Sequence, residues 1–218
     1  MDGRLHLIIG NKNYSSWSLR PWLALKFFKI PFDETVIPLD QPETHEKILK
    51  FSPSGKVPLL LSENARVWES LAICEMLHDL FPEKKMWPSG ISDRAQARAI
   101  SNEMHAGFQT LRELCPMKVK ERFADFDYSK AKTDIDRIQQ LWTECLTKHS
   151  HRGPFLFGEL SIADCMFAPV VFRFRTYGVK VNDVCQKYVD HMLSLNAMKE
   201  WAAGAENESF VMARYEKN

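Results

Sequence analysis

The spacing of apolar and polar residues divides the chain into two unlike parts. Over roughly the first 80 residues, short apolar runs alternate with stretches of helical spacing. The run LHLIIG at 5–10 predicts a buried strand, and the apolar spacing that follows predicts a helix over 16–29. Because proline is acceptable only in the first turn of a helix, Pro21 lets the start of this helix shift by a few residues.

The rest of the first part completes a small mixed sheet. After the first helix the pattern predicts a strand, a short helix, the two strands of a hairpin and a third helix, at 32–38, 42–53, 57–61, 65–68 and 69–81. A strand, a helix and a strand in so few residues form a right-handed parallel unit. The order βαβαββα therefore predicts an α/β domain over residues 1–81.

Strand signals nearly vanish in the second part of the chain. The segment 82–91, with two prolines, a glycine and several charges, is expected to be a linker. After it, helical spacing predicts four helices, at 92–115, 129–149, 161–175 and 184–203. The predicted fold class is therefore α/β followed by all-α, with residues 92–218 as an all-helical domain.

The amino-acid composition limits the classes of function that fit this chain. The chain has 218 residues, 45% of them apolar, and a net charge of +1, which favours a folded protein and gives no nucleic-acid footprint. The five cysteines are widely spaced and form no metal-binding motif, so neither a metal site nor a disulfide framework is expected. No apolar run is long enough for a signal peptide or a membrane span, and we expect a cytoplasmic protein without a membrane partner.

A serine cluster at the first helix is the first candidate for chemistry. The stretch NYSSWSLRPW at 13–22 places three serines where a strand passes into a helix. A helix N-terminus carries unpaired N–H groups and a partial positive charge, so a hydroxyl there can donate to an anion. The alternative is that the serines only cap the helix.

Two further features stand at similar junctions. Pro58 opens a strand, which leaves backbone groups of Val57 free. A cis bond would direct these groups into a cleft, but this feature taken alone favours an ordinary trans edge proline. Ser70 follows Glu69 at the start of a helix, where a hydroxyl and a backbone N–H can bind a carboxylate. Here too, helix capping is the alternative.

Taken together, four motifs resemble those of the cytosolic glutathione transferases. They are SSWSLR, GKVP, ES and SIAD, in this order, within a resemblance that runs from Leu5 to about Trp201. The SSxSxR pattern is most similar to the serine-type, zeta-like branch, which includes maleylacetoacetate isomerases. The resemblance implies a thioredoxin-like first domain, a helical second domain, glutathione as co-substrate and a homodimer.

The resemblance also implies roles in binding glutathione. Ser15, with Ser16 as the alternative, matches the hydroxyl that hydrogen-bonds the glutathione sulfur. Other positions match the residues that hold the peptide backbone of glutathione, its γ-glutamyl end and its glycyl carboxylate: Val57 with the family's cis-proline Pro58, Glu69 with Ser70, and Lys56. No cysteine precedes Cys74, so thiol–disulfide chemistry by an enzyme cysteine is not expected.

A pocket for the electrophile is expected between the two domains. Its candidate residues come from the first loop and the first long helix: Tyr14, Trp17, Met104, His105, Phe108 and Arg112. The alternative is that Met104 and Phe108 belong to the core and that Arg112 is solvated. Arg173 and Arg175 can bind an acidic substrate or form ion pairs.

The motif SIAD has a structural interpretation. Ser161 and Asp164 have the spacing of a capping box, in which each side chain bonds the other residue's backbone N–H. We therefore expect a structural cap there and not a binding site.

The expected function is that of a glutathione transferase that activates the glutathione thiol for attack on a small electrophile. The enzyme alternatives are a glutathione-dependent isomerase of the maleylacetoacetate type and a glutathione peroxidase. A non-catalytic interaction module of the same fold is the third alternative.

Overall fold

The computed structural model describes residues 4–215. Its first part contains one four-stranded sheet in the order β2-β1-β3-β4, with strands β1 Leu5–Ile9, β2 Phe32–Val36, β3 Leu59–Leu61 and β4 Arg66–Trp68. Strand β1 runs parallel to β2 and antiparallel to β3, and β3 is antiparallel to β4. This mixed sheet is the predicted one.

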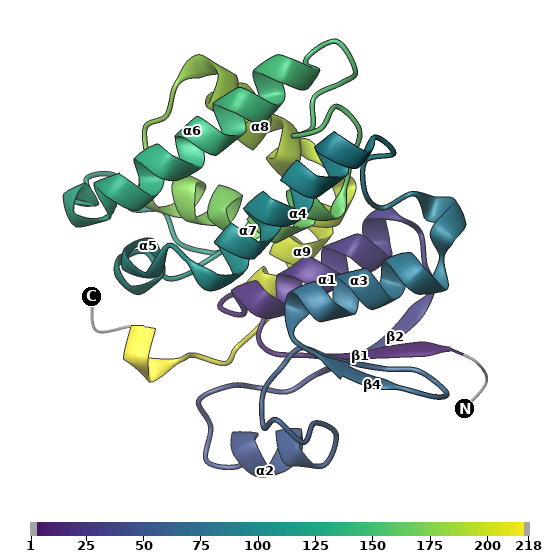
Figure 1. Ribbon diagram of the computed structural model, residues 1–218. Coiled ribbons are helices and arrows are strands. Elements are labelled where there is room, and N and C mark those ends of the chain that lie inside the picture. The colour runs from purple at the N-terminus through teal and green to yellow at the C-terminus, as the bar shows by residue number, and fades with distance from the viewer. Residues whose placement is uncertain (1–3, 216–218) are drawn as a thin grey trace.

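Alternation along β1 explains how the sheet is covered on both faces. Leu7 and Ile9 belong to the large core beneath helices α1 (Ser16–Phe27) and α3 (Ser70–Leu80). Ile8 points the other way, into a small cluster with Ile48 of helix α2 (Thr44–Leu49). Successive side chains of a strand face opposite sides of the sheet, so β1 is apolar on both. Figure 1 shows α1 and α3 on one side of the sheet and α2 on the other.

The second part is helical. It comprises α4 Ile91–Ala106, α5 Gln109–Leu114, α6 Lys132–His149, α7 Ile162–Tyr177, α8 Asp183–Ser194 and α9 Asn196–Glu206, with short 3-10 turns at Pro82–Lys84, Ser129–Ala131 and Ala213–Tyr215. Helix α7 is buried along nearly its whole length and packs against α1, α4 and α8. It is therefore the central helix, and it joins the helical part to the sheet part.

Three expectations about helices were wrong. The helix expected at 92–115 is two helices, α4 and α5, because Phe108 takes a left-handed conformation with φ of 61°. The helix expected at 184–203 is also divided, because Leu195 is extended between α8 and α9. Pro21 lies in the second turn of α1 and not in its first. Its missing N–H costs only one bond, to the carbonyl four residues earlier, at the very start of the helix.

The start of α7 holds a buried carboxylate. Asp164 Oδ2 accepts hydrogen bonds from Ser161 N at 2.8 Å and Ser161 Oγ at 3.0 Å. Its Oδ1 accepts from Leu156 N at 3.0 Å and from the Tyr188 hydroxyl at 3.1 Å. Burial raises the pKa of Asp164 to about 6, although these hydrogen bonds oppose the shift. Asp164 thus ties a loop, α7 and α8 together at one point.

The end of the chain returns to the sheet part. The Trp201 ring of α9 packs edge-on against Trp22 of α1, with ring centroids 5.1 Å apart. Trp201 Nε1 donates to the Lys12 carbonyl at 2.8 Å. Lys26 of α1 forms an ion pair with Glu200 of α9 at 2.6 Å. Beyond α9 the chain runs past the N-terminal end of α1 (Figure 1).

Candidate functional site

The N-terminus of α1 places two serine hydroxyls, those of Ser15 and Ser18, in a short hydrogen-bonded chain. Ser15 precedes the first turn of α1, and its hydroxyl donates to Ser18 Oγ at 2.7 Å. Ser18 Oγ also accepts from Gly10 N at 3.0 Å. The chain therefore runs from the end of β1 through Ser18 to Ser15.

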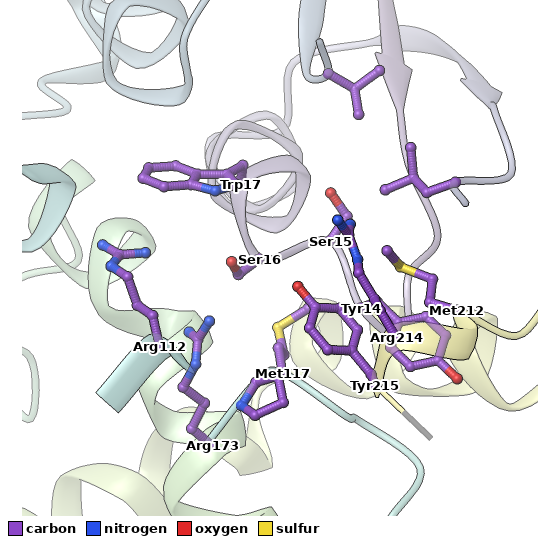
Figure 2. A pocket seen from close by; sticks show the side chains of 13 residues that line it. Tyr14, Ser15, Ser16, Trp17, Arg112, Met117, Arg173, Met212, Arg214 and Tyr215 are labelled. Atoms are coloured by element: carbon purple, nitrogen blue, oxygen red, sulfur yellow. The ribbon is translucent and has the colours of Figure 1, made fainter. Parts of the chain in front are cut away.

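Ser16 has different surroundings. Its hydroxyl makes no hydrogen bond to another residue in the described part of the chain, 4–215, although the residue is only 6% exposed. Figure 2 shows its Oγ facing the same open space as the guanidinium groups of Arg112 and Arg173. Both Ser15 and Ser16 line this space.

This space is a cavity of about 210 Å³, which we call the first cavity. Its described lining residues are Tyr14, Ser15, Ser16, Trp17, Leu39, Val57, Arg112, Pro116, Met117, Arg173, Met212, Arg214 and Tyr215. They include three arginines and no aspartate or glutamate. The first cavity is therefore strongly cationic.

Two of these arginines are held by backbone carbonyls. Arg173 is 4% exposed, and its Nε donates to the Cys115 carbonyl at 2.9 Å. Its Nη1 has no hydrogen-bond partner among residues 4–215. Burial, and then the charge of Arg112, lower the pKa of Arg173 to about 10. Arg112 Nε donates to the Gly107 carbonyl at 2.9 Å, and its Nη2 donates to the Met104 carbonyl. Both side chains remain cations at neutral pH without a carboxylate beside them in the cavity wall.

A second cavity of about 230 Å³ adjoins the first. It is lined by Trp17, Ser54, Lys56, Val57, Pro58, Trp68 and Glu69, and Trp17 and Val57 also line the first cavity. The Val57–Pro58 bond is cis, the isomer that the resemblance implied. The structure thus brings Lys56, Val57, Pro58 and Glu69 together in one hollow beside the serine loop.

Ser70 lies behind this second cavity. It is the first residue of α3 and is fully buried, and its hydroxyl accepts from Arg20 Nη1 at 3.3 Å. Arg20 is fully buried too, and no carboxylate of residues 4–215 forms an ion pair with it. Burial lowers the pKa of Arg20 well below its usual value. Its guanidinium lies 4.4 Å from the centre of the Trp17 ring, on which Arg112 also packs at 4.7 Å.

The structure brings together only part of the expected electrophile pocket. Tyr14, Trp17 and Arg112 line the first cavity, but Met104 and Phe108 lie in the hydrophobic core and do not. His105 does not line it either. Its ring packs edge-on against Trp17 at 5.2 Å, and its Nε2 lies 3.7 Å from Glu69 Oε2. Burial is the main cause that lowers the pKa of His105.

Comparison with protein-family models now identifies the fold and the family. Residues 14–80 match the model "Glutathione S-transferase, N-terminal domain", and residues 97–204 match "Glutathione S-transferase, C-terminal domain". The chain belongs to the glutathione S-transferase family. The resemblance seen in the sequence is confirmed, and so is the thioredoxin-like domain followed by a helical domain.

Curated relatives extend over about three quarters of this glutathione S-transferase. A probable maleylacetoacetate isomerase of Caenorhabditis elegans is 27% identical over 169 residues, 77% of either chain. The maleylacetoacetate isomerase of Dictyostelium discoideum is 28% identical, over 76% of this chain and 78% of its own. Glutathione S-transferase 1 of Dianthus caryophyllus is 28% identical, over 72% of either chain.

Solved structures share the fold over almost the full length. A glutathione transferase homologue from Burkholderia gl BGR1, crystallised with bound glutathione, has a TM-score of 0.71 at 20% identity and covers 94% of this chain and 100% of its own. The Tau class enzyme of the mango Mangifera indica has a TM-score of 0.72 at 19% identity, over 100% of this chain and 99% of its own.

Several lining residues of this transferase were missed in the sequence. Pro116 and Met117 lie in an irregular segment after α5, and Met212, Arg214 and Tyr215 lie beyond α9. No periodicity marks either segment, and the only available signal was the pair of adjacent charged and aromatic residues near the C-terminus.

The described residues contain neither a metal-binding cluster nor a membrane-spanning helix. In the range 4–215 no group of three or more histidine, cysteine, aspartate or glutamate side chains is placed to hold a metal ion. Within the same range no helix is both long and apolar enough to cross a membrane. All five cysteines are buried and unpaired, and burial raises the pKa of Cys74 to about 12.

Proposed function

We propose that this enzyme binds glutathione in the second cavity and activates its thiol at the N-terminus of α1. One observation carries the proposal: the two cavities meet at Trp17 and Val57, beside the serine loop. A peptide thiol bound along Val57 would thus reach the first cavity, where an electrophile can be held. The glutathione seen in the related Burkholderia structure supports this assignment.

We propose Ser15 as the donor to the sulfur, as the sequence resemblance implies. A hydroxyl can rotate, so Ser18 Oγ can donate to Ser15 Oγ and leave the Ser15 proton for a thiolate. The hydrogen bond from Gly10 N to Ser18 Oγ would then polarise both hydroxyls. Ser16 is the alternative donor, because its hydroxyl faces the first cavity and is unused.

The main contribution of the serine hydroxyls and the N-terminus of α1 is to stabilise the glutathione thiolate. A free thiol has a pKa of roughly 8.5, so only a few per cent is ionised at neutral pH. Lowering this pKa by about 2 units requires ~2.7 kcal/mol of preferential binding of the anion. A hydroxyl donor and the positive end of α1 both favour the anion.

We propose that Glu69 and Ser70 hold the γ-glutamyl end of glutathione and that Lys56 reaches its glycyl carboxylate. Lys56 and Glu69 line the second cavity, and Ser70 starts the helix behind it. The hydrogen bond from Arg20 occupies one lone pair of Ser70 Oγ and leaves the hydroxyl proton of Ser70 available for donation. That proton can then be donated to a carboxylate.

A glutathione-dependent isomerase of the maleylacetoacetate type is the second candidate. Two observations favour it: the names of the curated relatives and the three arginines of the first cavity, which suit a carboxylate-bearing electrophile. An isomerase adds glutathione to its substrate and releases it again, so it does not consume the thiol.

Product mass tests the proposed function. The purified protein is incubated with glutathione and a panel of neutral and carboxylate-bearing electrophiles. A product heavier by one glutathione indicates a transferase, an isomer of unchanged mass that forms only with glutathione indicates an isomerase, and oxidised glutathione indicates a peroxidase. Absence of both turnover and retention on immobilised glutathione would contradict the proposal and favour an interaction module.

We further propose that the protein is a cytoplasmic homodimer. Exposed apolar side chains at Trp68, Leu80 and Ile91 support a subunit interface, and five unpaired thiols suit a reducing compartment. Light scattering that returned the mass of one 25.3 kDa chain at micromolar concentration would refute the dimer. Cell fractionation checks the compartment.

A further inference from the structure

The segment after α9 closes one side of the first cavity. Met212, Arg214 and Tyr215 line the cavity, together with residues from α1, α5 and α7. Met212 is buried, whereas Arg214 is exposed. Figure 2 shows the three side chains on the side of the cavity opposite Arg112. We call residues 208–215 the C-terminal strap.

The strap is fastened to the loop that leads into the serine cluster. The Glu208 carboxylate accepts from Lys12 N at 2.6 Å and from Asn13 N at 3.1 Å. Lys120 Nζ donates to the Glu208 carbonyl. At the far end of the strap the Tyr215 ring stacks on Tyr14, with centroids 5.9 Å apart. Both attachments hold the strap against residues 12–14.

The positive charge of the first cavity indicates the role of the C-terminal strap. Arg214 adds a third guanidinium to those of Arg112 and Arg173, and the described wall contains no carboxylate. Arg173 is also nine-tenths buried with an unpartnered Nη1. A buried cationic donor without a partner costs free energy, which a bound anion recovers. The strap thus contributes charge to a site that lacks only its anion.

We propose that Arg214 is a specificity-determining residue that binds a carboxylate of the second substrate, and that Glu208 latches the strap so that Arg214 faces the cavity. The proposal rests on the proposed function, because it concerns the electrophile side of the same site. It predicts that a carboxylate ligand is favoured over its uncharged analogue and that this preference depends on the strap.

Binding of a non-reactive carboxylate tests the proposal without turnover. Succinate and uncharged succinamide are titrated into the full-length protein by calorimetry, at saturating glutathione and constant ionic strength. A charge-assisted hydrogen bond contributes enough that Arg214→Met should weaken succinate binding about tenfold. Succinamide binding and glutathione affinity should not change. Arg66→Met, an exposed arginine of β4 outside both cavities, is the matched control and should bind succinate like the wild type.

A double mutant tests the latch. Glu208→Ala should release the strap and weaken succinate binding as much as Arg214→Met does. In the double variant the loss should be no greater than in either single variant, because Arg214 is already displaced. Losses that multiply would overturn the latch. Because Glu208 is partly buried, the melting temperature is measured first; Arg214 is exposed, and its variant decides the proposal alone.

The outcomes separate this inference from the proposed function. If Arg214→Met leaves succinate binding unchanged, or if the wild type does not bind succinate, the proposed role of the strap is overturned. This conclusion holds even if the enzyme turns over neutral electrophiles. Arginine-dependent succinate binding in a protein that shows no glutathione-dependent turnover would uphold the anion site and refute the proposed function.

Discussion

Three serine hydroxyls at the N-terminus of α1 have three different surroundings, and this difference makes their roles separable. Ser18 accepts from the backbone just after β1, and Ser15 donates to Ser18. Ser16 faces the first cavity and bonds no other residue that the structure describes. Of the three, Ser15 both hydrogen-bonds Ser18, which accepts from Gly10 N, and lines the first cavity, where a thiol would lie. The sequence shows three equivalent serines, because it cannot show which way each hydroxyl turns.

Alanine variants of these serines should differ in how they titrate. Ser15→Ala should raise the thiol pKa of bound glutathione and lower turnover at neutral pH by about one to two powers of ten, with partial recovery as pH rises. Ser18→Ala should act in the same direction but less, because it removes only the second hydroxyl of the chain. Ultraviolet absorbance of the thiolate, titrated in each complex, is the measurement. If Ser16→Ala shifts the pKa and Ser15→Ala does not, the sulfur partner is Ser16.

At the scale of an element, the break between α4 and α5 shapes the first cavity. Apolar spacing continues across the break, so the sequence predicts one helix and places Met104, Phe108 and Arg112 on one face. In the structure a Cβ at Gly107 would lie 2.8 Å from the Glu103 carbonyl, so the glycine permits the close turn that ends α4. Arg112 then folds back on α4, and its guanidinium reaches the first cavity. The side chains of Met104 and Phe108 stay in the core.

The start of α7 supports a prediction about stability. Asp164→Ala would leave the amides of Leu156 and Ser161 and the Tyr188 hydroxyl without their acceptor. Each buried donor so orphaned costs about 1–3 kcal/mol, so the loss should be roughly 3 kcal/mol or more. Ser161→Ala removes one hydroxyl and should cost about 0.5–2 kcal/mol. Urea unfolding measures both; equal losses would show that Asp164 is an ordinary cap.

The same carboxylate predicts a pH dependence. The folded chain holds the Asp164 proton with a pKa of about 6, above the value of roughly 3.9 in an unfolded chain. Its contribution to the free energy of unfolding is therefore greatest below about pH 4 and falls as pH rises to about 6. Asp164→Asn has no carboxyl group that titrates at this position, so its free energy of unfolding should lack this decrease. The difference in unfolding free energy between the two proteins, measured between about pH 4 and pH 7, should change with this sign, and a constant difference would contradict it.

At the scale of the whole molecule, the fold was predictable and the cavity was not. Strand alternation, the hairpin turn and the helix signals are local, so the order of elements in the first part followed from the sequence. Three motifs, SSWSLR, GKVP and ES, then located most residues of the second cavity, and the whole of its described lining lies in that first part. The described wall of the first cavity combines residues 14–17, Leu39, Val57, Arg112, Pro116, Met117, Arg173, Met212, Arg214 and Tyr215. No local pattern connects such distant segments, and its cationic character emerges only from tertiary structure.

The return of α9 to α1 has a consequence for the covalent chain itself. Trp201, Glu200 and the strap attach the end of the helical part to α1 and to the loop before it, independently of the connection at 82–90. The peptide bond after the exposed Lys85 should therefore be dispensable. Pieces 1–85 and 86–218, produced as separate polypeptides in one cell, should reassemble and co-elute. Trp201→Ala should weaken this complementation, and pieces that elute apart would show that the connection itself holds the two parts together.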